Sequence, residues 1–188
     1  MINKKTMLIT VSLIILISST VTASNLSIGQ GNYNVKFSNF SPSSAASDIS
    51  LISVGYGQDS YSGFAADVFS GDNSSGIEVE YQFVPQSLQN RQEKFNYAAK
   101  IGAVTGDYWE EDSSGLKAGV VIERKIDRER EVYFEADIIN SSAMIIDAEV
   151  GFCGRFGEGI MGVLGYKIAT HEDYETAEGV HYGIKIDF

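Results

Sequence analysis

The stretch GVHYGIKIDF, residues 179–188, ends the chain and alternates between two kinds of side chain. Every second residue is apolar or aromatic: Val180, Tyr182, Ile184, Ile186 and Phe188. Successive side chains of a β-strand point to opposite faces, so the stretch predicts a strand with one apolar and one polar face. Ordering each residue at a chain end costs about 1–2 kcal/mol of backbone entropy, so this strand needs a partner that holds it in place.

The same two-residue period recurs in segments throughout the chain. They span residues 77–83, 95–105, 115–124, 132–138, 143–153 and 160–168, with further candidates at 33–40, 49–57 and 63–70. Clusters of Gly, Asn, Asp and Ser separate many of them, as is typical of antiparallel hairpins. The pattern predicts an antiparallel, all-β chain.

Two stretches leave a helical alternative open. Pro85 precedes the segment QSLQNRQEK, for which we predict a turn, with room for one helical turn, before the strand that begins at Phe95. Residues 140–150, NSSAMIIDAEV, have the start of a capped helix, but their apolar side chains fit the two-residue period better. We therefore predict a strand there.

Residues 1–23 have the layout of a secretory signal peptide. Lys4 and Lys5 precede a short apolar run, and the small residues Val21 and Ala23 precede the expected cleavage site. The alternative, an uncleaved membrane anchor, would need about 18 unbroken apolar residues, and this run is shorter. We expect export, cleavage after Ala23 and a single domain over residues 24–188.

Charge and cysteine usage exclude several classes of protein. The net charge is −11, and removal of the leader with its two lysines makes it more negative. A surface of this sign repels nucleic acid, so we expect no nucleic-acid partner. Cys153 is the only cysteine, so no internal disulfide can form.

The alternation alone does not tell which face meets water. A soluble barrel buries its apolar face, whereas a transmembrane barrel turns that face toward lipid. Several segments have the roughly 9–11 residues that a tilted strand needs to cross a bilayer, and the polar faces are rich in glycine, as a narrow interior requires. Aromatic residues lie near segment ends, as in interfacial girdles: Tyr108, Trp109, Phe152, Phe156, Tyr174 and Phe188.

The leader, the amphipathic strands and the terminal YGIKIDF resemble small bacterial outer-membrane β-barrel proteins of the OmpX and OmpA size class. No subfamily is identified. The resemblance implies a closed, antiparallel, up-and-down transmembrane barrel whose last strand pairs with the first. In that group the last strand usually ends in Phe and is read by the barrel-assembly machinery during insertion. The residues here that match this assembly signal are Tyr182, Ile184, Ile186 and Phe188.

The number of strands is eight or ten. Counting backward from the terminal strand and stopping at Phe64 yields eight strands, and adding residues 49–57 and 33–40 yields ten. Both counts are even, so parity does not choose between them. The strand-like pattern of the two upstream segments favours ten.

Many charged residues fall on the face that a barrel of this kind turns inward. The predicted lumen charges are Glu78, Glu80, Lys100, Lys117, Glu123, Glu135, Asp137, Asp147, Glu149, Lys167 and Lys185, with Asp67, Asp187 and His181 beside them. A catalytic interpretation would pair His181 with Glu149 or Asp147, but no Ser or Cys stands in a nucleophile motif. We favour a salt-bridged interior, in which the excess of carboxylates would attract cations if water passes.

The segment THEDYETAEG, residues 170–179, contains candidate calcium ligands in Glu172, Asp173 and Glu175. It lacks the spacing of an EF-hand loop, so we favour an acidic, solvated external loop. We expect no cofactor and no metal.

Together these features predict an integral outer-membrane β-barrel without enzymatic activity. Its role would be structural or mediated by loops with an unknown partner, with at most weak, cation-preferring solute passage. Its expected partners are outer-membrane lipid and the barrel-assembly machinery. Two alternatives stay open: a soluble exported β-barrel that binds an apolar ligand, and a lipid-modifying outer-membrane enzyme.

Overall fold

The structure, a computed structural model, describes residues 30–43, 47–91, 95–108, 111–112, 114–141, 144–171 and 176–188. The predicted signal peptide lies outside these residues. The strands are β1 (Tyr33–Pro42), β2 (Ile49–Gly57), β3 (Ser62–Ser70), β4 (Ser75–Phe83), β5 (Phe95–Tyr108), β6 (Glu111–Asp112), β7 (Gly115–Lys125), β8 (Arg130–Asn140), β9 (Met144–Gly157), β10 (Ile160–His171) and β11 (Ala177–Asp187).

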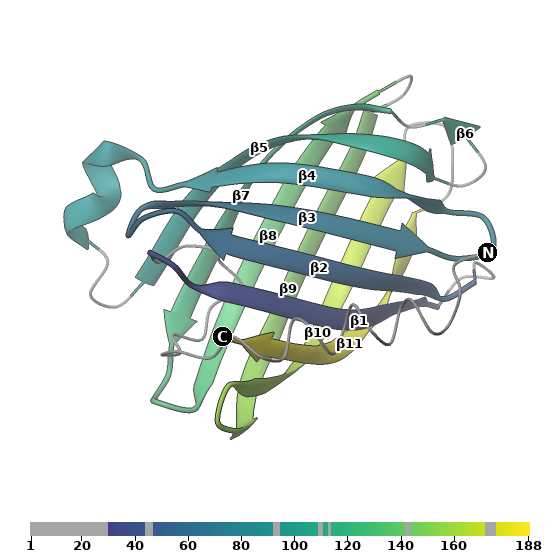
Figure 1. Ribbon diagram of the computed structural model, residues 1–188. Coiled ribbons are helices and arrows are strands. Elements are labelled where there is room, and N and C mark those ends of the chain that lie inside the picture. Colours follow the sequence, from purple (N-terminus) through teal and green to yellow (C-terminus); the bar gives the residue numbers. More distant parts are fainter. Residues whose placement is uncertain are drawn as a thin grey trace, which may run out of the picture.

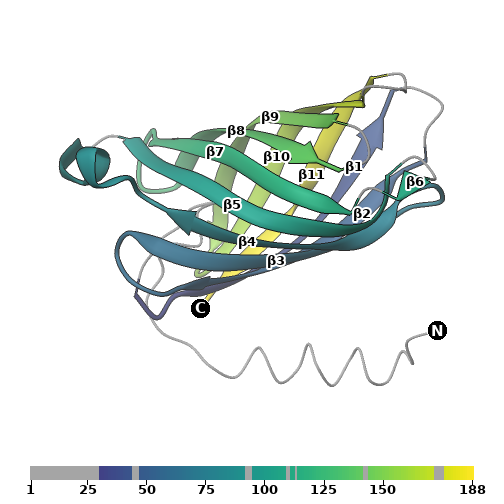
Figure 2. The same cartoon turned by 90° about the horizontal axis from the view of Figure 1, so that it is seen from above.

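The long strands form one closed antiparallel barrel (Figures 1 and 2). Each long strand pairs with the next long strand along the chain, so that β4 pairs with β5 and β5 with β7, and β1 pairs with β11 to complete the ring. The two-residue β6 pairs only with the end of β5 and stands outside the ring. The barrel therefore has ten strands, which confirms the up-and-down topology and the higher of the two predicted counts.

The seam between β1 and β11 holds both ends of the described chain. Asn34 lies opposite Asp187, and the register continues to Pro42 opposite Gly179. The backbone N–H of Phe188 donates to the carbonyl of Tyr33 at 2.8 Å, and the N–H of Tyr33 donates back at 3.3 Å. This pairing is the partner that the terminal strand needs. We call this end of the barrel the terminal rim and the opposite end the distal rim.

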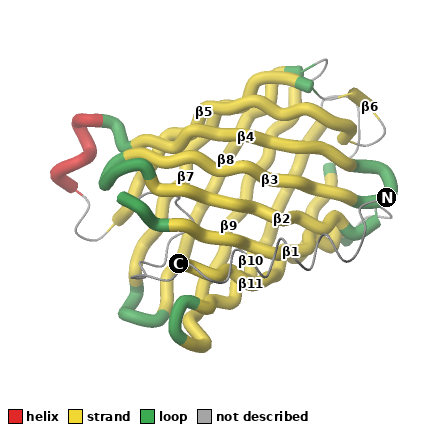
Figure 3. Tube along the Cα trace, in the orientation of Figure 1, coloured by secondary structure: helices red, strands yellow, loops and turns green. Residues whose placement is uncertain are grey.

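The short helical segment lies at the terminal rim. It is η1 (Gln86–Arg91), a 3-10 helix that follows Pro85 and joins β4 to β5 (Figure 3). The sequence predicts a turn here with room for one helical turn, and the structure has a six-residue 3-10 helix, which is about two turns long. Residues 144–150 belong to β9, so the strand interpretation of that stretch is correct. In the described part of the chain, no helix is long and apolar enough to cross a membrane.

The two faces of the strands differ as the alternation predicts. Outward apolar side chains are widely exposed, for example Val150 at 58% and Leu164 at 57%. Inward side chains are buried, and many of them are charged. A soluble protein buries its apolar side chains and solvates its charges, so this barrel is arranged in the opposite way.

Aromatic side chains form a row on the outer surface near the terminal rim. The ring centroids of Tyr33 and Tyr56 are 4.9 Å apart, and those of Phe64 and Tyr81 are 5.0 Å apart. Tyr56 and Phe64 are cross-strand partners, which joins the two pairs into one band. Bands of this kind occupy the lipid–water interface in membrane barrels.

Of the aromatic residues predicted for such girdles, Phe152 and Phe156 are exposed, Phe156 at 81%. The side chain of Tyr108, and all of Trp109 and Tyr174, lie outside the described residues.

Candidate functional site

The interior of the barrel gathers every predicted lumen charge. All eleven of those residues lie on inward faces, and so do Asp67, Asp187 and His181. The structure adds two inward residues that the sequence reading left out, Lys36 and Glu131. The interior therefore carries more carboxylates than lysines.

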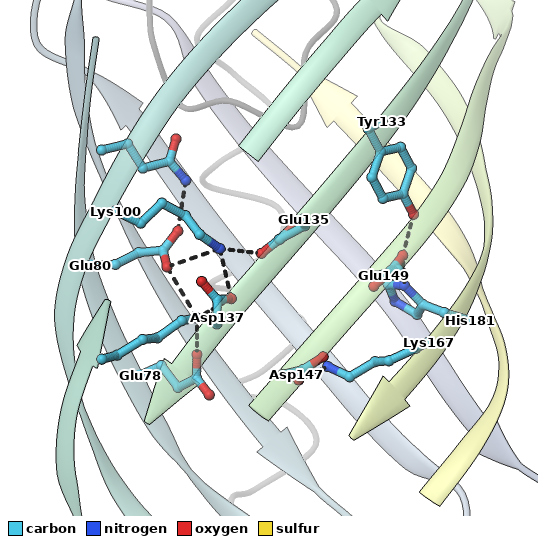
Figure 4. Close-up of polar contacts among 12 residues, drawn as sticks. Glu78, Glu80, Lys100, Tyr133, Glu135, Asp137, Asp147, Glu149, Lys167 and His181 are labelled. Atoms are coloured by element: carbon cyan, nitrogen blue, oxygen red, sulfur yellow. Dashed lines mark hydrogen bonds and ion pairs between the residues drawn. The ribbon is translucent and has the colours of Figure 1, made fainter. Parts of the chain in front are cut away.

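Lys100 is the centre of the first ionic cluster (Figure 4). Its side chain extends from β5 and is only 1% exposed. Its ammonium group forms a close ion pair with Glu135, lies 2.7 Å from Asp137 and lies 3.7 Å from Glu80. Three carboxylates therefore converge on one buried cation.

Lys117 on β7 also belongs to this cluster, because it shares two of its carboxylates with Lys100. Its ammonium nitrogen lies 2.6 Å from Glu78, 3.1 Å from Glu80 and 3.3 Å from Asp137. Glu80 also accepts a 2.7 Å hydrogen bond from the amide of Gln82. Two lysines thus share four carboxylates, and such buried charges are tolerated only because they are paired and hydrogen-bonded.

A second cluster lies on β8 to β11, on the part of the wall that adjoins the first cluster at β8. Lys167 pairs with Asp147 at 2.6 Å, and His181 Nδ1 lies 2.6 Å from a carboxylate oxygen of Glu149. The hydroxyl of Tyr133 donates a close hydrogen bond to the same oxygen. Of the two histidine–carboxylate pairs considered from sequence, the structure brings together His181 and Glu149, whereas Asp147 is taken by Lys167.

The Tyr133 ring also explains two of the interior glycines. A side chain at Gly151 would overlap the ring of Tyr133, and a Cβ at Gly165 would lie 2.9 Å from its hydroxyl. Both positions must stay small so that the ring can lie flat against the inner wall and reach Glu149. The small residues predicted for the polar face therefore leave the space in which the Tyr133 ring packs.

A third group of charges lies inside the terminal rim. Lys185 is 3.4 Å from Asp187, and Glu123, which is 0% exposed, accepts a 3.5 Å hydrogen bond from Asn96. Glu131 lies in the same region and is 2% exposed. Across the described residues, no group of acidic, histidine or cysteine side chains has the arrangement of a metal site. The candidate calcium ligands Glu172, Asp173 and Glu175 lie outside those residues.

The space left between these side chains is small. One cavity of about 80 Å³ is lined by Glu78, Lys117 and His181 among others, and one of about 30 Å³ lies toward Gln82 and Lys185. Lys36, Asp67 and Glu135 line both cavities. A water molecule occupies about 30 Å³ in the liquid, so these cavities have room for a few waters.

An apolar layer fills the interior at the distal rim. Phe69, Val104, Ile139 and Ile145 are each at most 3% exposed and pack together, with Ile49 and Leu51 against them. We call these six side chains the distal plug. The interior is thus polar in its middle and apolar at one mouth, a division that the sequence reading did not include.

The fold is similar to those of solved outer-membrane β-barrels. A KdgM porin, solved in complex with disordered oligogalacturonate, matches 82% of this chain and 99% of its own, with a TM-score of 0.53 and 9% identity. The chain has the fold of the outer-membrane β-barrels. This confirms the fold class predicted from the alternating strands.

Two further outer-membrane β-barrels match less closely. The translocator domain of the autotransporter NalP from Neisseria meningitidis has a TM-score of 0.41 and 9% identity, with 98% of this chain and 95% of that one covered. Ail, the attachment invasion locus protein of Yersinia pestis, has a TM-score of 0.34 and 10% identity, with 84% and 95% covered. No family model and no curated protein matches the chain.

Within an outer-membrane β-barrel, the outward residues acquire a definite role. Exposed apolar side chains such as Val79, Ile101 and Ile138, each about half exposed, form the surface that such barrels turn toward lipid. Tyr182 and Ile184, which the sequence predicts as part of an assembly signal, belong to this surface at 44% and 45% exposure, and Ile186 and Phe188 continue it to the terminal rim.

Proposed function

We propose that the chain is an integral protein of a bacterial outer membrane, exported by residues 1–23, with its terminal rim in the periplasm. The observation that carries this proposal is the orientation of the strands. Isoleucine, valine and phenylalanine side chains are exposed around the outside, whereas the ionic clusters of Lys100, Lys117 and Lys167 are buried inside. In water this arrangement would expose apolar surface far beyond the patches of soluble proteins.

Its main role, in this proposal, is structural or mediated by the loops of the distal rim, and it has no enzymatic activity. The connections there are short, at 43–48, 71–74, 109–114, 141–143 and 172–176. Short loops supply little surface for an adhesive or receptor function. The closely paired interior supports a scaffold role, because its described side chains leave only cavities of about 30 and 80 Å³ between them.

Solute passage is at most weak and favours cations. The excess of interior carboxylates attracts cations and repels anions. The similar KdgM porin was solved with oligogalacturonate, which is a polyanion. An interior such as this one, with Glu78, Glu135 and Asp137 beside its larger cavity, is unsuited to a polyanion.

Fractionation tests the proposed location. The mature chain is expected to remain in the outer-membrane fraction after a carbonate wash, to require detergent for extraction, and to migrate differently on a gel before and after boiling. Closed barrels resist denaturation by detergent until they are heated, because no strand edge is open. A protein that is released by carbonate and stays folded in plain buffer would contradict the proposal and favour the soluble ligand-binding alternative.

The two alternatives fit the geometry less well. A soluble barrel that binds an apolar ligand needs an apolar pocket, whereas the cavities here are lined by Lys36, Asp67 and Glu135. A lipid-modifying enzyme would use His181 with Glu149, but this pair faces the interior, away from the surface that meets lipid.

We further propose that the barrel-assembly machinery reads the terminal strand through Tyr182, Ile184, Ile186 and Phe188. Deletion of Phe188 is expected to lower the amount of folded, heat-modifiable barrel in the outer membrane several-fold, because it also removes the two backbone hydrogen bonds with Tyr33. Phe188→Tyr, which keeps the ring and the backbone bonds, is the matched control and is expected to assemble normally. Assembly of the deletion variant at the level of the unaltered protein would contradict this proposal.

A further inference from the structure

Three side chains divide the space inside the barrel. The larger cavity, of about 80 Å³, is lined in part by the distal plug, and the smaller one, of about 30 Å³, lies toward the terminal rim beside Asn34 and Lys185. Among the described residues, Lys36 on β1, Asp67 on β3 and Glu135 on β8 alone line both cavities. We call these three side chains the junction. An ion that moves between the two cavities has to pass it.

Lys36 differs from the other lysines of the interior. Each of the others has a carboxylate oxygen within 3.4 Å of its ammonium nitrogen: Lys100, Lys117, Lys167 and Lys185. Within the part of the chain that the structure describes, no carboxylate lies at ion-pair distance from the ammonium group of Lys36. Its cross-strand neighbours are Ser53 on β2 and Lys185 on β11, so neither adjacent strand supplies a negative charge at this level. The positive charge of Lys36 is therefore not bound to a single partner.

The carboxylates of the junction leave room for a further cation. The Oδ1 atom of Asp67 has no hydrogen-bond partner among the described residues. Glu135 forms an ion pair with Lys100, yet 27% of its side chain remains accessible. The charge of Lys36 attracts both of these carboxylates, and it also attracts Glu149 in the larger cavity. Lys36 thus serves several carboxylates at once, as a dissolved cation would.

We propose that Lys36 is a tethered counterion of the interior. Its ammonium group occupies the junction in place of an inorganic cation and keeps such cations out of both cavities. Lysine suits this role because it has a compact charge on a flexible stem. The excess of carboxylates attracts small cations, whereas a positive charge held between low-dielectric walls repels them strongly. This inference rests on the cation preference proposed above, and it identifies the residue that limits cation passage.

Lys36→Met tests the proposal through the salt that stabilises the barrel. Methionine keeps most of the side-chain volume and removes the charge, so a sodium ion can take its place at the junction. An ion that binds the folded barrel but not the unfolded chain raises stability. In lipid vesicles, the urea midpoint of Lys36→Met is therefore expected to be higher in sodium chloride than in the same concentration of N-methyl-D-glucamine chloride, whose cation is too bulky for these cavities. The unaltered protein is expected to have the same midpoint in both salts.

Three further variants make this comparison specific. Lys36→Arg keeps the charge and is expected to behave like the unaltered protein. Lys36→Gln removes the charge but keeps a polar end, and it is expected to show the same salt difference as Lys36→Met. Lys125→Met removes a lysine charge at the exposed end of β7, outside both cavities, and it is expected to show no salt difference.

Conductance supplies a second measurement, in a barrel whose distal plug is opened by Phe69→Ala. Phe69 lines the larger cavity, so its truncation connects that cavity to the distal mouth. The double variant Phe69→Ala with Lys36→Met is expected to conduct sodium several-fold better than Phe69→Ala alone, because the barrier at the junction is gone. Phe69→Ala with Lys36→Arg is expected to conduct like Phe69→Ala alone.

Equal urea midpoints of Lys36→Met in the two salts would overturn the inference, and so would a salt difference of the same size in Lys36→Arg or Lys125→Met. Equal sodium conductance with and without Lys36→Met would also overturn it. The proposed cation preference fails separately, through a reversal potential of Phe69→Ala that favours anions. A folded, heat-modifiable and cation-preferring barrel without these sodium effects would therefore count against the role of Lys36 alone.

Discussion

Lys100→Met is expected to lower the free energy of unfolding by about 3–5 kcal/mol, because it removes the cation from a buried group of carboxylates. Lys100 is 1% exposed and contacts Glu135, Asp137 and Glu80. Methionine keeps most of the side-chain volume, so the loss reports on charge rather than on a cavity. Lys117 alone would then face all the carboxylates of the cluster. The measurement is urea unfolding in lipid vesicles, followed by the gel mobility of the folded form.

Two variants make this result specific. Lys125→Met removes the same charge from an exposed position at the end of β7 and is expected to change stability by no more than about 0.5 kcal/mol. The double variant Lys100→Met with Glu135→Gln removes both partners and is expected to regain part of the loss. A Lys100→Met protein as stable as the unaltered one would show that the ionic cluster does not hold the interior together.

Phe69→Ala is expected to convert a poorly conducting barrel into a cation-preferring channel. Phe69 is 3% exposed and belongs to the distal plug with Val104, Ile139 and Ile145. Apolar constrictions exclude ions because water leaves them readily, and removal of the one ring in the distal plug opens the way to the acidic cavity beneath. Single-channel conductance and the reversal potential in a salt gradient measure the effect. The truncation also costs about 3–5 kcal/mol of stability, so the gel shift must show that the variant is folded.

Phe64→Ala is the matched control for this experiment. Phe64 lies on the same strand but points outward, with 45% of its surface exposed. The two variants remove the same ring from opposite faces of the wall, and only Phe69→Ala is expected to raise the conductance. A Phe69→Ala barrel that conducts no better than Phe64→Ala, or that prefers anions, would contradict the assignment of the plug and of the acidic interior.

The strands of the barrel wall were predictable from the sequence, because the two-residue alternation of side chains can be recognised within each strand alone. Each strand repeats its outward and inward side chains every two residues, so segments such as 144–153 and 179–188 reveal both the strand and its faces. The pairing of the last strand with the first also followed, since one edge of the terminal strand pairs with β10 and a closed barrel leaves only the first strand for its other edge.

The distal plug was not predictable in the same way. Sorting residues by polarity assigns apolar side chains to the lipid face, yet Phe69 and Ile139 are apolar and point inward near strand ends. Glu131 was missed for a related reason: β8 begins at Arg130, two residues before the apolar alternation that starts at Val132. Once the bounds of β3 and β8 are known, counting every second residue along each strand places Phe69, Glu131 and Ile139 on the inward face.

The pattern of a single strand does not predict which charged residues form ion pairs with each other. Lys100 on β5 reaches Glu135 on β8 across the intervening β7, and Lys117 on β7 reaches Glu78 on β4 across β5. These contacts depend on the curvature of the wall and the relative stagger of non-adjacent strands. Periodicity identifies the face of each residue but contains neither quantity.

The β1–β11 seam has a consequence for how the chain enters a bilayer. It joins the two strands that are most distant in the chain, Asn34 opposite Asp187, and the entropic cost of such a closure grows with the length between its ends. Until those strands meet, both carry unpaired N–H and C=O groups, each of which costs several kcal/mol in hydrocarbon. Insertion of single hairpins one after another is thus disfavoured, and crossing and sealing should form one concerted transition.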